Sequence, residues 1–438
     1  MQMLKPFEYE GIWWLPDKPE EKIEGTLRFD PSKGAKLELK EISNIEEVSV
    51  ILGCSLSPIS GIEFTLLHCY NQARDLLGVV PPEFYVKYVF MGVHSHFDKK
   101  ENIKFRNISI QYLYLDDWAN IQVFDIDFKS EGNMVIKYSK FKSIPVNIDE
   151  KLKIAVNAGV KDSLFPREEI NLKEINLKKR AEIKIEPSEE KPFEYYLDII
   201  DKIQKFLTLA VLKPVCPVEI KGTTELHKEE RIGQTDYLPI EVYYKIPNIP
   251  NLPEEISPDN MLFTLKDIPS TDRLGELLKN WFERTKTKEL KPIYESYFGI
   301  LYNPSCYFEY RFFSFVAAIE GYHQRKFSGE ETLKERLDKL FEKYQVILNE
   351  LTEEELERLK IKDKNEFTCK VKDVRNYLAH FNEEKERKVS DVDLYLLTRK
   401  LELLIHAILL EEIGFDLSRI EELLKREIQQ DRNKTVNH

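Results

Sequence analysis

Hydrophobic and polar residues alternate along the first part of the chain, and this alternation predicts β-strands. The clearest segment covers residues 21–29, where apolar and polar side chains alternate before the turn-forming residues 30–34. Strands are predicted on the same grounds at residues 7–15, 22–29, 35–42, 47–52, 63–67, 85–91, 108–115, 133–138 and 152–156. Short strands at this spacing indicate a sandwich or a barrel.

A charge-rich stretch interrupts this pattern at residues 167–191. It ends in Glu-Pro-Ser-Glu-Glu-Lys-Pro at residues 186–192, which is typical of an exposed connection. A helical pattern follows at residues 193–211, and strand-like alternation returns at residues 215–245. We therefore expect a soft boundary near residue 190 within a β-rich part that extends to about residue 255.

Beyond residue 270 the apolar residues recur at three- and four-residue steps, which predicts helices. The predicted helices cover residues 271–287, 307–326, 330–350, 352–360, 365–381, 391–413 and 417–429. In the helix at 391–413, Ser390 can cap the start with Asp393, and Gly414 can end it in the left-handed conformation. Because this helix is apolar around much of its circumference, we expect it at the centre of a bundle or at a dimer interface.

These patterns predict an α+β protein, and a length of 438 residues favours more than one domain. A β-rich, sandwich-like or barrel-like domain would occupy residues 1–255, with the soft boundary near 190. Residues 256–290 would connect it to an all-α bundle at residues 291–430. The longest apolar run, residues 403–410, is too short to cross a bilayer, and the start of the chain lacks a secretory signal, so we expect no membrane association and a cytoplasmic location.

Charge and cysteine content limit the possible functions. The net charge of −12 argues against a protein that coats nucleic acid through a broad basic surface, but it leaves room for a small basic cleft. The five cysteines include no CxxC pair, so we expect reduced thiols, no metal site and no cofactor. His94 and His96, with His68 or Cys69, could in principle hold a metal, but loop histidines are the better interpretation.

The residues that carry candidate chemistry are Arg375, Asn376 and His380, near the end of the predicted helix at 365–381, where Asn382 can end the helix. Asn376 and His380 are four residues apart and share a face, whereas Arg375 and His380 are separated by about 140° around the axis. One helix therefore does not direct all three side chains at one point. Either Arg375 curls around the helix end, or two copies of the motif meet across a two-fold axis.

The six residues Arg375-Asn376-Tyr377-Leu378-Ala379-His380 resemble the R-N-x-x-x-H signature of HEPN ribonucleases. Residues 315–323, Phe-Val-Ala-Ala-Ile-Glu-Gly-Tyr-His, resemble the first helix of the ApeA-like HEPN group, in which an acidic residue faces the motif, and Glu320 is the matching position. Residues 11–16 and 25–31 resemble the opening of the ApeA N-terminal domain. The resemblance thus spans both ends of the chain.

The resemblance implies an anti-phage, abortive-infection protein whose N-terminal region senses a phage-derived trigger and whose dimeric HEPN domain cuts RNA without a metal. The residues permit attack by the RNA 2′-hydroxyl on the adjacent phosphate, with His380 as general base or acid. Arg375 would stabilise the developing charge, and Asn376 would orient the phosphate or the imidazole. Structured loops with unstacked bases, such as a transfer-RNA anticodon loop, are the easiest targets.

Each of these signals also has a plainer interpretation. The HEPN bundle could be a non-catalytic scaffold, with the β-rich domain binding a protein or nucleotide ligand. Glu320 could be an ordinary surface charge or the partner of Arg375. Asp373, two residues before Arg375, is a candidate supporting residue but suits a solvated or capping role better. Trp13 and Trp14 alternate across a strand, so one is expected in the core, and the other could be an exposed sensor contact.

Overall fold

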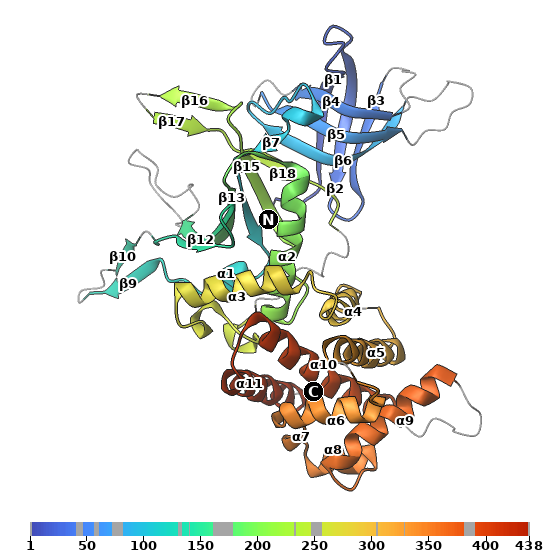
Figure 1. The fold of residues 1–438 in the computed structure, drawn as a ribbon. Helices are drawn as coiled ribbons and strands as arrows, with labels where there is room; N and C mark the ends of the chain where they lie inside the picture. Colours follow the sequence, from blue (N-terminus) through green and yellow to red (C-terminus); the bar gives the residue numbers. More distant parts are fainter. Residues whose placement is uncertain are drawn as a thin grey trace. The chain divides into compact units, whose positions relative to one another are not determined.

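The computed structural model describes residues 2–40, 47–56, 61–71, 82–129, 134–139, 141–160, 178–231, 234–246, 256–303, 305–327, 329–380 and 390–436. The chain divides into two compact units, which are described separately (Figure 1). The first comprises residues 1–204 and 215–256, and the second comprises residues 205–214 and 257–438. The first is rich in strands and the second in helices, so the predicted α+β class with a β-rich start and a helical end is confirmed.

Six strands of the first unit close into a barrel. These strands are β1 (Phe7–Trp14), β2 (Ile23–Asp30), β3 (Gly34–Leu39), β4 (Glu47–Ser55), β5 (Glu63–Asn71) and β6 (Glu83–Gly92). Their order is β6-β3-β2-β1-β4-β5, and the pairing of β5 with β6 closes the ring. Alternation explains the inside of the barrel, since Leu27 and Phe29 of β2 are buried while Arg28 between them is exposed.

The sheet continues from β6 into an open part, in the order β18-β15-β8-β13-β12-β11. Its strands are β8 (Asn107–Tyr112), β11 (Ile144–Asn147), β12 (Leu152–Val160), β13 (Lys179–Pro187), β15 (Pro217–Thr223) and β18 (Ile240–Tyr243). Three two-stranded pairs accompany it, formed by β7 (Lys104–Phe105) with β14 (Lys191–Pro192), β9 (Phe124–Phe128) with β10 (Met134–Tyr138), and β16 (Lys228–Arg231) with β17 (Gln234–Tyr237).

The strand β13 corrects the prediction of an exposed connection at residues 167–191. It lies between β12 and β8 in the sheet, and its Ala181, Ile183 and Ile185 are buried. Charged residues occupy the alternate positions of the same strand, so its charge content concealed a period-two pattern. Residues 167–177 of the predicted connection lie outside the described residues.

Among its described residues, the first unit contains the helix α1 (Leu115–Ala119) and the first part of α2 (Phe193–Val211). The prediction of a helix at residues 193–211 is confirmed. Buried tyrosines fix the first part of α2 to the strands, because Tyr196 Oη donates to the carbonyl oxygen of Phe105 at 2.6 Å, and Tyr112 Oη donates to that of Ile200 at 3.0 Å. From Lys205 onward the helix belongs to the second unit.

The second unit is a helical bundle. Its helices are α3 (Thr271–Arg284), α4 (Lys291–Leu301), α5 (Phe308–Lys326), α6 (Leu333–Lys343), α7 (Val346–Asn349), α8 (Glu353–Leu359), α9 (Phe367–His380), α10 (Asp391–Ile413) and α11 (Leu417–Val436). The helix α10 lies at its centre and contacts α3, α5, α7, α8 and α11. As predicted, Ser390 and Asp393 form a capping box at its start, and Gly414 takes a φ of 113° after its end.

Two helix predictions need correction. Residues 330–350 do not form one helix, because α6 ends at Lys343 and α7 begins at Val346. Between them the buried Tyr344 leaves helical geometry, and its hydroxyl bonds to the carboxylate of Glu411 on α10. The helix α4 was not predicted, although its first turn carries Pro292, which suits the start of a helix.

Candidate functional site

The helix α9 carries the motif, and its apolar face fixes it in the bundle. Phe367, Val371 and Val374 are buried at steps of four and three residues, which defines the inward face. A short 3₁₀ turn, η4 (Lys364–Glu366), precedes the helix. The side chain of Asp363 caps this turn by accepting a hydrogen bond from the backbone N–H of Asn365 at 2.8 Å. The motif at residues 375–380 occupies the last six positions of the helix, and Asn382 lies outside the described residues.

Arg375 has three partners within the bundle. Its Nη2 atom lies 3.5 Å from Glu320 Oε2 on α5, and its Nη1 atom donates to Asn376 Oδ1 at 3.2 Å. Its guanidinium also lies over the ring of Phe313, 5.9 Å from the ring centroid. The side chains of Arg375 and Glu320 are 30% and 29% exposed, so both remain accessible to a ligand while they hold each other.

Phe313 and Glu320 face Arg375 together because they are seven residues, or almost two turns, apart on α5. A cation over an aromatic face and a carboxylate at the side restrict the guanidinium to a narrow range of orientations. Glu320 was expected to be either an ordinary surface charge or the partner of Arg375, and the two side chains are in contact. Phe313 was not predicted, because no spacing within the sequence connects it with Arg375, which lies 62 residues later.

His380 is the last residue of α9, and it is exposed. Asn376, on the same face, is half-buried. Among the described residues, no hydrogen bond or ion pair joins His380 to Arg375. One copy of the chain therefore brings Arg375, Asn376 and Glu320 together, while His380 is exposed at the last position of the helix.

Asp373 lies apart from this group. Its side chain is 64% exposed, and its carboxylate is 3.6 Å from the ammonium group of Lys372. Because two residues correspond to about 200° around a helix, Asp373 and Arg375 lie on nearly opposite sides of α9. The arrangement favours a solvated Asp373.

A second set of residues stabilises the backbone of α5 and the loop that follows it near Glu320. Arg336 of α6 is buried, and it donates through Nη1 to the backbone oxygen of Glu320 at 3.4 Å and through Nε to that of Glu331 at 2.9 Å. His323, one turn after Glu320, is buried with its Nδ1 atom 3.4 Å from the Glu331 carboxylate. Burial lowers the pKa of His323, which favours a neutral imidazole in this position.

The histidines of the first unit form no metal site in the part of the chain that the structure describes, where no group of three His, Cys, Asp or Glu side chains could hold an ion. His94 and His96 follow the end of β6 in a loop. His96 Nε2 lies 2.8 Å from the Gly53 carbonyl oxygen, and the burial of Cys69 raises its thiol pKa.

Trp13 is buried, as expected of one tryptophan of the pair, and Trp14 packs edge-on against His96.

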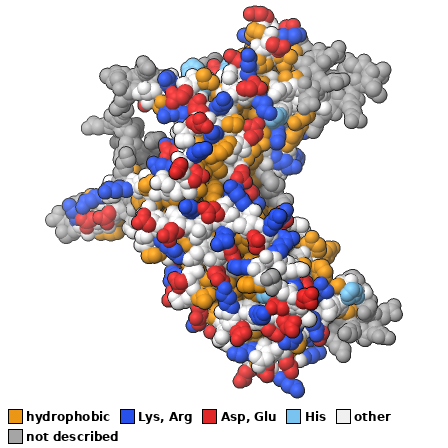
Figure 2. All heavy atoms as spheres, viewed as in Figure 1, with side chains coloured by type: hydrophobic (Ala, Val, Ile, Leu, Met, Phe, Trp, Pro, Cys, Tyr) orange, Lys and Arg blue, Asp and Glu red, His pale blue; other side chains and the backbone are white. Residues whose placement is uncertain are grey.

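On the described residues of the face seen in Figure 2, no broad basic surface is visible. On the face seen in Figure 2, positive and negative side chains are interspersed over each unit. Across the described helices, none combines the length and the apolar character that a bilayer crossing requires.

Comparison with known families gives two matches, the first of which extends beyond the first unit into α3. Residues 8–281 match the family model described as ApeA N-terminal domain 1, and residues 313–419 match the one described as Apea-like HEPN. The second match begins at Phe313 and includes Glu320 and the motif of α9. Neither the curated proteins nor the solved structures yield a match. Since the first match alone covers more than half of the 438 residues, the chain belongs to the ApeA family, with an ApeA N-terminal domain followed by an Apea-like HEPN domain.

Proposed function

We propose that this protein is a metal-independent endoribonuclease of anti-phage defence, with its catalytic site at Arg375, Asn376 and His380. The observation that carries the proposal is the restrained guanidinium of Arg375, held between Glu320 and Phe313 beside Asn376 on the helix that ends in His380. A fixed, accessible guanidinium with an amide next to it suits recognition of a phosphate. The resemblance to HEPN ribonucleases supplies the reaction class and the defence role.

In the proposed reaction, the 2′-oxygen of RNA forms a bond to the adjacent phosphorus, and the bond from phosphorus to the 5′-oxygen breaks. The 2′-hydroxyl proton passes to a general base, and the leaving 5′-oxygen receives a proton from a general acid. His380 has the side-chain chemistry for both roles near neutral pH. The products are a 2′,3′-cyclic phosphate and a 5′-hydroxyl, and DNA, which lacks the nucleophile, is not cut.

The complete site in this proposal is formed by two copies of the chain. One His380 would then act as base and the other as acid, while two Arg375 side chains share the charge of the phosphorane. This arrangement accommodates the exposed position of His380, since an exposed imidazole can reach a symmetry-related copy. A local site of this kind also suits a protein with a net charge of −12.

The test is incubation of the purified protein with total cellular RNA in excess EDTA, followed by chemical analysis of the fragment ends. We expect the wild type to cut a restricted set of RNAs, such as a transfer-RNA anticodon loop, and to leave 2′,3′-cyclic phosphates. Arg375→Ala and His380→Ala should lower the rate by about 100-fold or more. Arg358→Ala, which removes an exposed arginine of α8, is the matched control and should cut normally.

Two outcomes contradict the proposal. Equal cleavage by wild type, Arg375→Ala and His380→Ala would refute the assignment of the site. Absence of cleavage by the wild type would favour the alternative, in which the HEPN bundle is a non-catalytic scaffold and the β-rich unit binds a protein or nucleotide ligand.

A further inference from the structure

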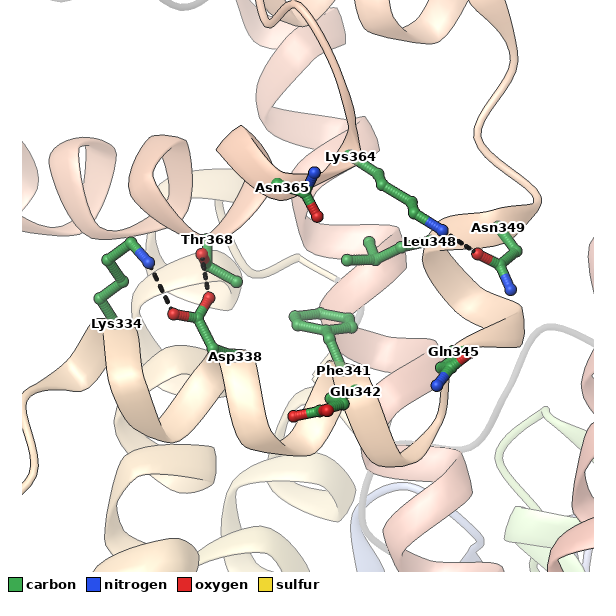
Figure 3. Close-up of a pocket in the computed structure, with 10 residues that line it drawn as sticks. All are labelled: Lys334, Asp338, Phe341, Glu342, Gln345, Leu348, Asn349, Lys364, Asn365 and Thr368. Atoms are coloured by element: carbon green, nitrogen blue, oxygen red, sulfur yellow. Dashed lines mark hydrogen bonds and ion pairs between the residues drawn. The ribbon is translucent and has the colours of Figure 1, made fainter.

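A cleft of 460 Å³ lies in the helical unit at the opposite end of α9 from the motif. It is bounded by α6, α7, η4 and the first turn of α9, and Figure 3 shows its lining side chains. The ring of Phe341, which is 3% exposed, and the half-buried Leu348 form the apolar part of its wall near the middle, and the amides of Gln345, Asn349 and Asn365 lie around them. The volume falls within the range of about 300–1,000 Å³ that small-molecule sites occupy.

The lining suits a nucleobase better than a phosphate. An apolar floor accepts the flat face of a base, and side-chain amides can both donate to and accept from its edge. The carboxylates of Asp338 and Glu342 also line the cleft and would repel a phosphate inside it. Lys334 is paired with Asp338 at 2.6 Å, whereas Lys364 donates to the neutral amide oxygen of Asn349 at 2.5 Å.

The cleft is connected to the proposed catalytic site along one flank of α9. Thr368, whose hydroxyl donates to Asp338 Oδ1 at 2.5 Å, lines the cleft seven residues before Arg375. Seven residues are almost two turns, so the two side chains lie on the same flank, about 10 Å apart along the axis. Lys372 occupies the turn between them, four residues after Thr368 and three before Arg375.

We propose that this cleft holds one base of a single-stranded RNA substrate, a few nucleotides from the bond that is cut. The inference rests on the proposed function, since it names a subsite of the same enzyme. The base occupies the cleft over Phe341 and Leu348, and the phosphates pass Lys364 and Lys372 on their way to Arg375. Cations along the flank and an uncharged floor in the cleft together define a path for an unpaired strand.

Binding of a short, fluorescently labelled, single-stranded 2′-O-methyl oligonucleotide to the full chain tests this proposal. The methyl group blocks the nucleophile, so fluorescence anisotropy measures binding without cleavage. The double variant Lys364→Ala/Asn365→Ala changes two exposed residues of the cleft and should weaken binding by about ten-fold. Lys362→Ala removes the same charge from an exposed position two residues away, outside the cleft, and should bind as the wild type does.

The outcomes separate the subsite from the proposed function. Unchanged affinity of the double variant, equal weakening by Lys362→Ala, or no binding by the wild type would each overturn the subsite. If the wild type binds and the double variant is weakened, but unmodified RNA is not cut, the cleavage proposal fails and the cleft assignment stands. If RNA is cut by both proteins with the same KM, the cleavage proposal stands and the cleft assignment fails.

Discussion

Glu427 of α11 is a buried carboxylate whose charge stabilises the helical unit. Its side chain is 2% exposed, it pairs with Arg399 of α10, and its Oε1 atom lies 3.0 Å from His406 Nδ1. His406 Nε2 in turn lies 2.9 Å from the hydroxyl of Tyr297. Burial opposes ionisation of Glu427, but the interactions with His406 and Arg399 outweigh it and lower its pKa to about 2.

This lowered pKa sets both the size and the pH range of the stabilisation. The difference between the ordinary value of 4.5 and a value of about 2 corresponds to about 3 kcal/mol in the free energy of unfolding. Because the folded pKa lies below that of the unfolded chain, the unfolded state takes up the proton first as the pH falls. The stabilisation is therefore complete above pH 4.5 and is lost as the pH falls through about 2.

The substitution Glu427→Gln keeps the shape of the side chain and removes its charge. We expect it to lower the free energy of unfolding by about 3 kcal/mol at neutral pH, and the difference from wild type should shrink as the pH approaches 2. Hydrogen exchange of peptides from α10 and α11, measured across a urea series at each pH, reports this quantity for the helical unit. Glu421→Gln, at an exposed position of the same helix, is the control and should change little.

The result that would refute this reasoning is a constant difference between wild type and Glu427→Gln from neutral pH down to pH about 3. Such a result would mean that the amide disturbs packing or hydrogen bonding, since those effects do not follow the titration of a carboxylate. An equal decrease in the free energy of unfolding for Glu427→Gln and Glu421→Gln would likewise show that the buried carboxylate stabilises the unit no more than an exposed one.

Two further predictions concern the proposed site and the barrel. Glu320→Gln should lower kcat/KM for RNA cleavage by about ten-fold, because Arg375 loses the carboxylate that orients it. Glu320→Asp should restore part of this rate, and Gln324→Ala, at an exposed position of the same helix, is the control. A rate for Glu320→Gln equal to that of wild type would contradict a positioning role for Glu320. Gly53→Ala should destabilise the first unit by about 1–3 kcal/mol in thermal unfolding, because an added Cβ would overlap the Trp13 ring. Gly299→Ala in α4, where a Cβ meets nothing within 4 Å, should instead be neutral or stabilising, and a loss there equal to that of Gly53→Ala would contradict the packing argument.

The local elements of this protein follow from its sequence because their causes are local. The alternation at residues 21–29 predicts β2, and the capping residues Ser390 and Gly414 fix the ends of α10. Where a contact between distant residues determines the end of an element or the pairing of strands, the sequence pattern does not predict it. The break between α6 and α7 depends on Tyr344 reaching Glu411, which lies 67 residues away. Closure of the barrel by β5 and β6 is likewise a matter of pairing that alternation does not specify.

The candidate site shows the same division between local and distant causes. The motif at residues 375–380 is visible in the sequence, and helical spacing alone separates Arg375 from His380. The contacts of Arg375 with Glu320 and Phe313 join residues more than 50 positions apart, so spacing could suggest them only through the resemblance to a family. The cleft at the start of α9 has no sequence signal, since its lining comes from four separate elements.

The two ends of the motif are held very differently, and this difference bears on how the proposed enzyme would work. Arg375 has a carboxylate, an aromatic ring and an amide as partners, so its guanidinium is oriented before any RNA arrives. His380 is exposed at the end of its helix, and among the described residues no hydrogen bond or ion pair joins it to Arg375. Catalysis needs the general base or acid held within hydrogen-bond reach of the proton that it moves. In our proposal the second copy and the bound RNA supply that constraint, which makes cleavage depend on assembly.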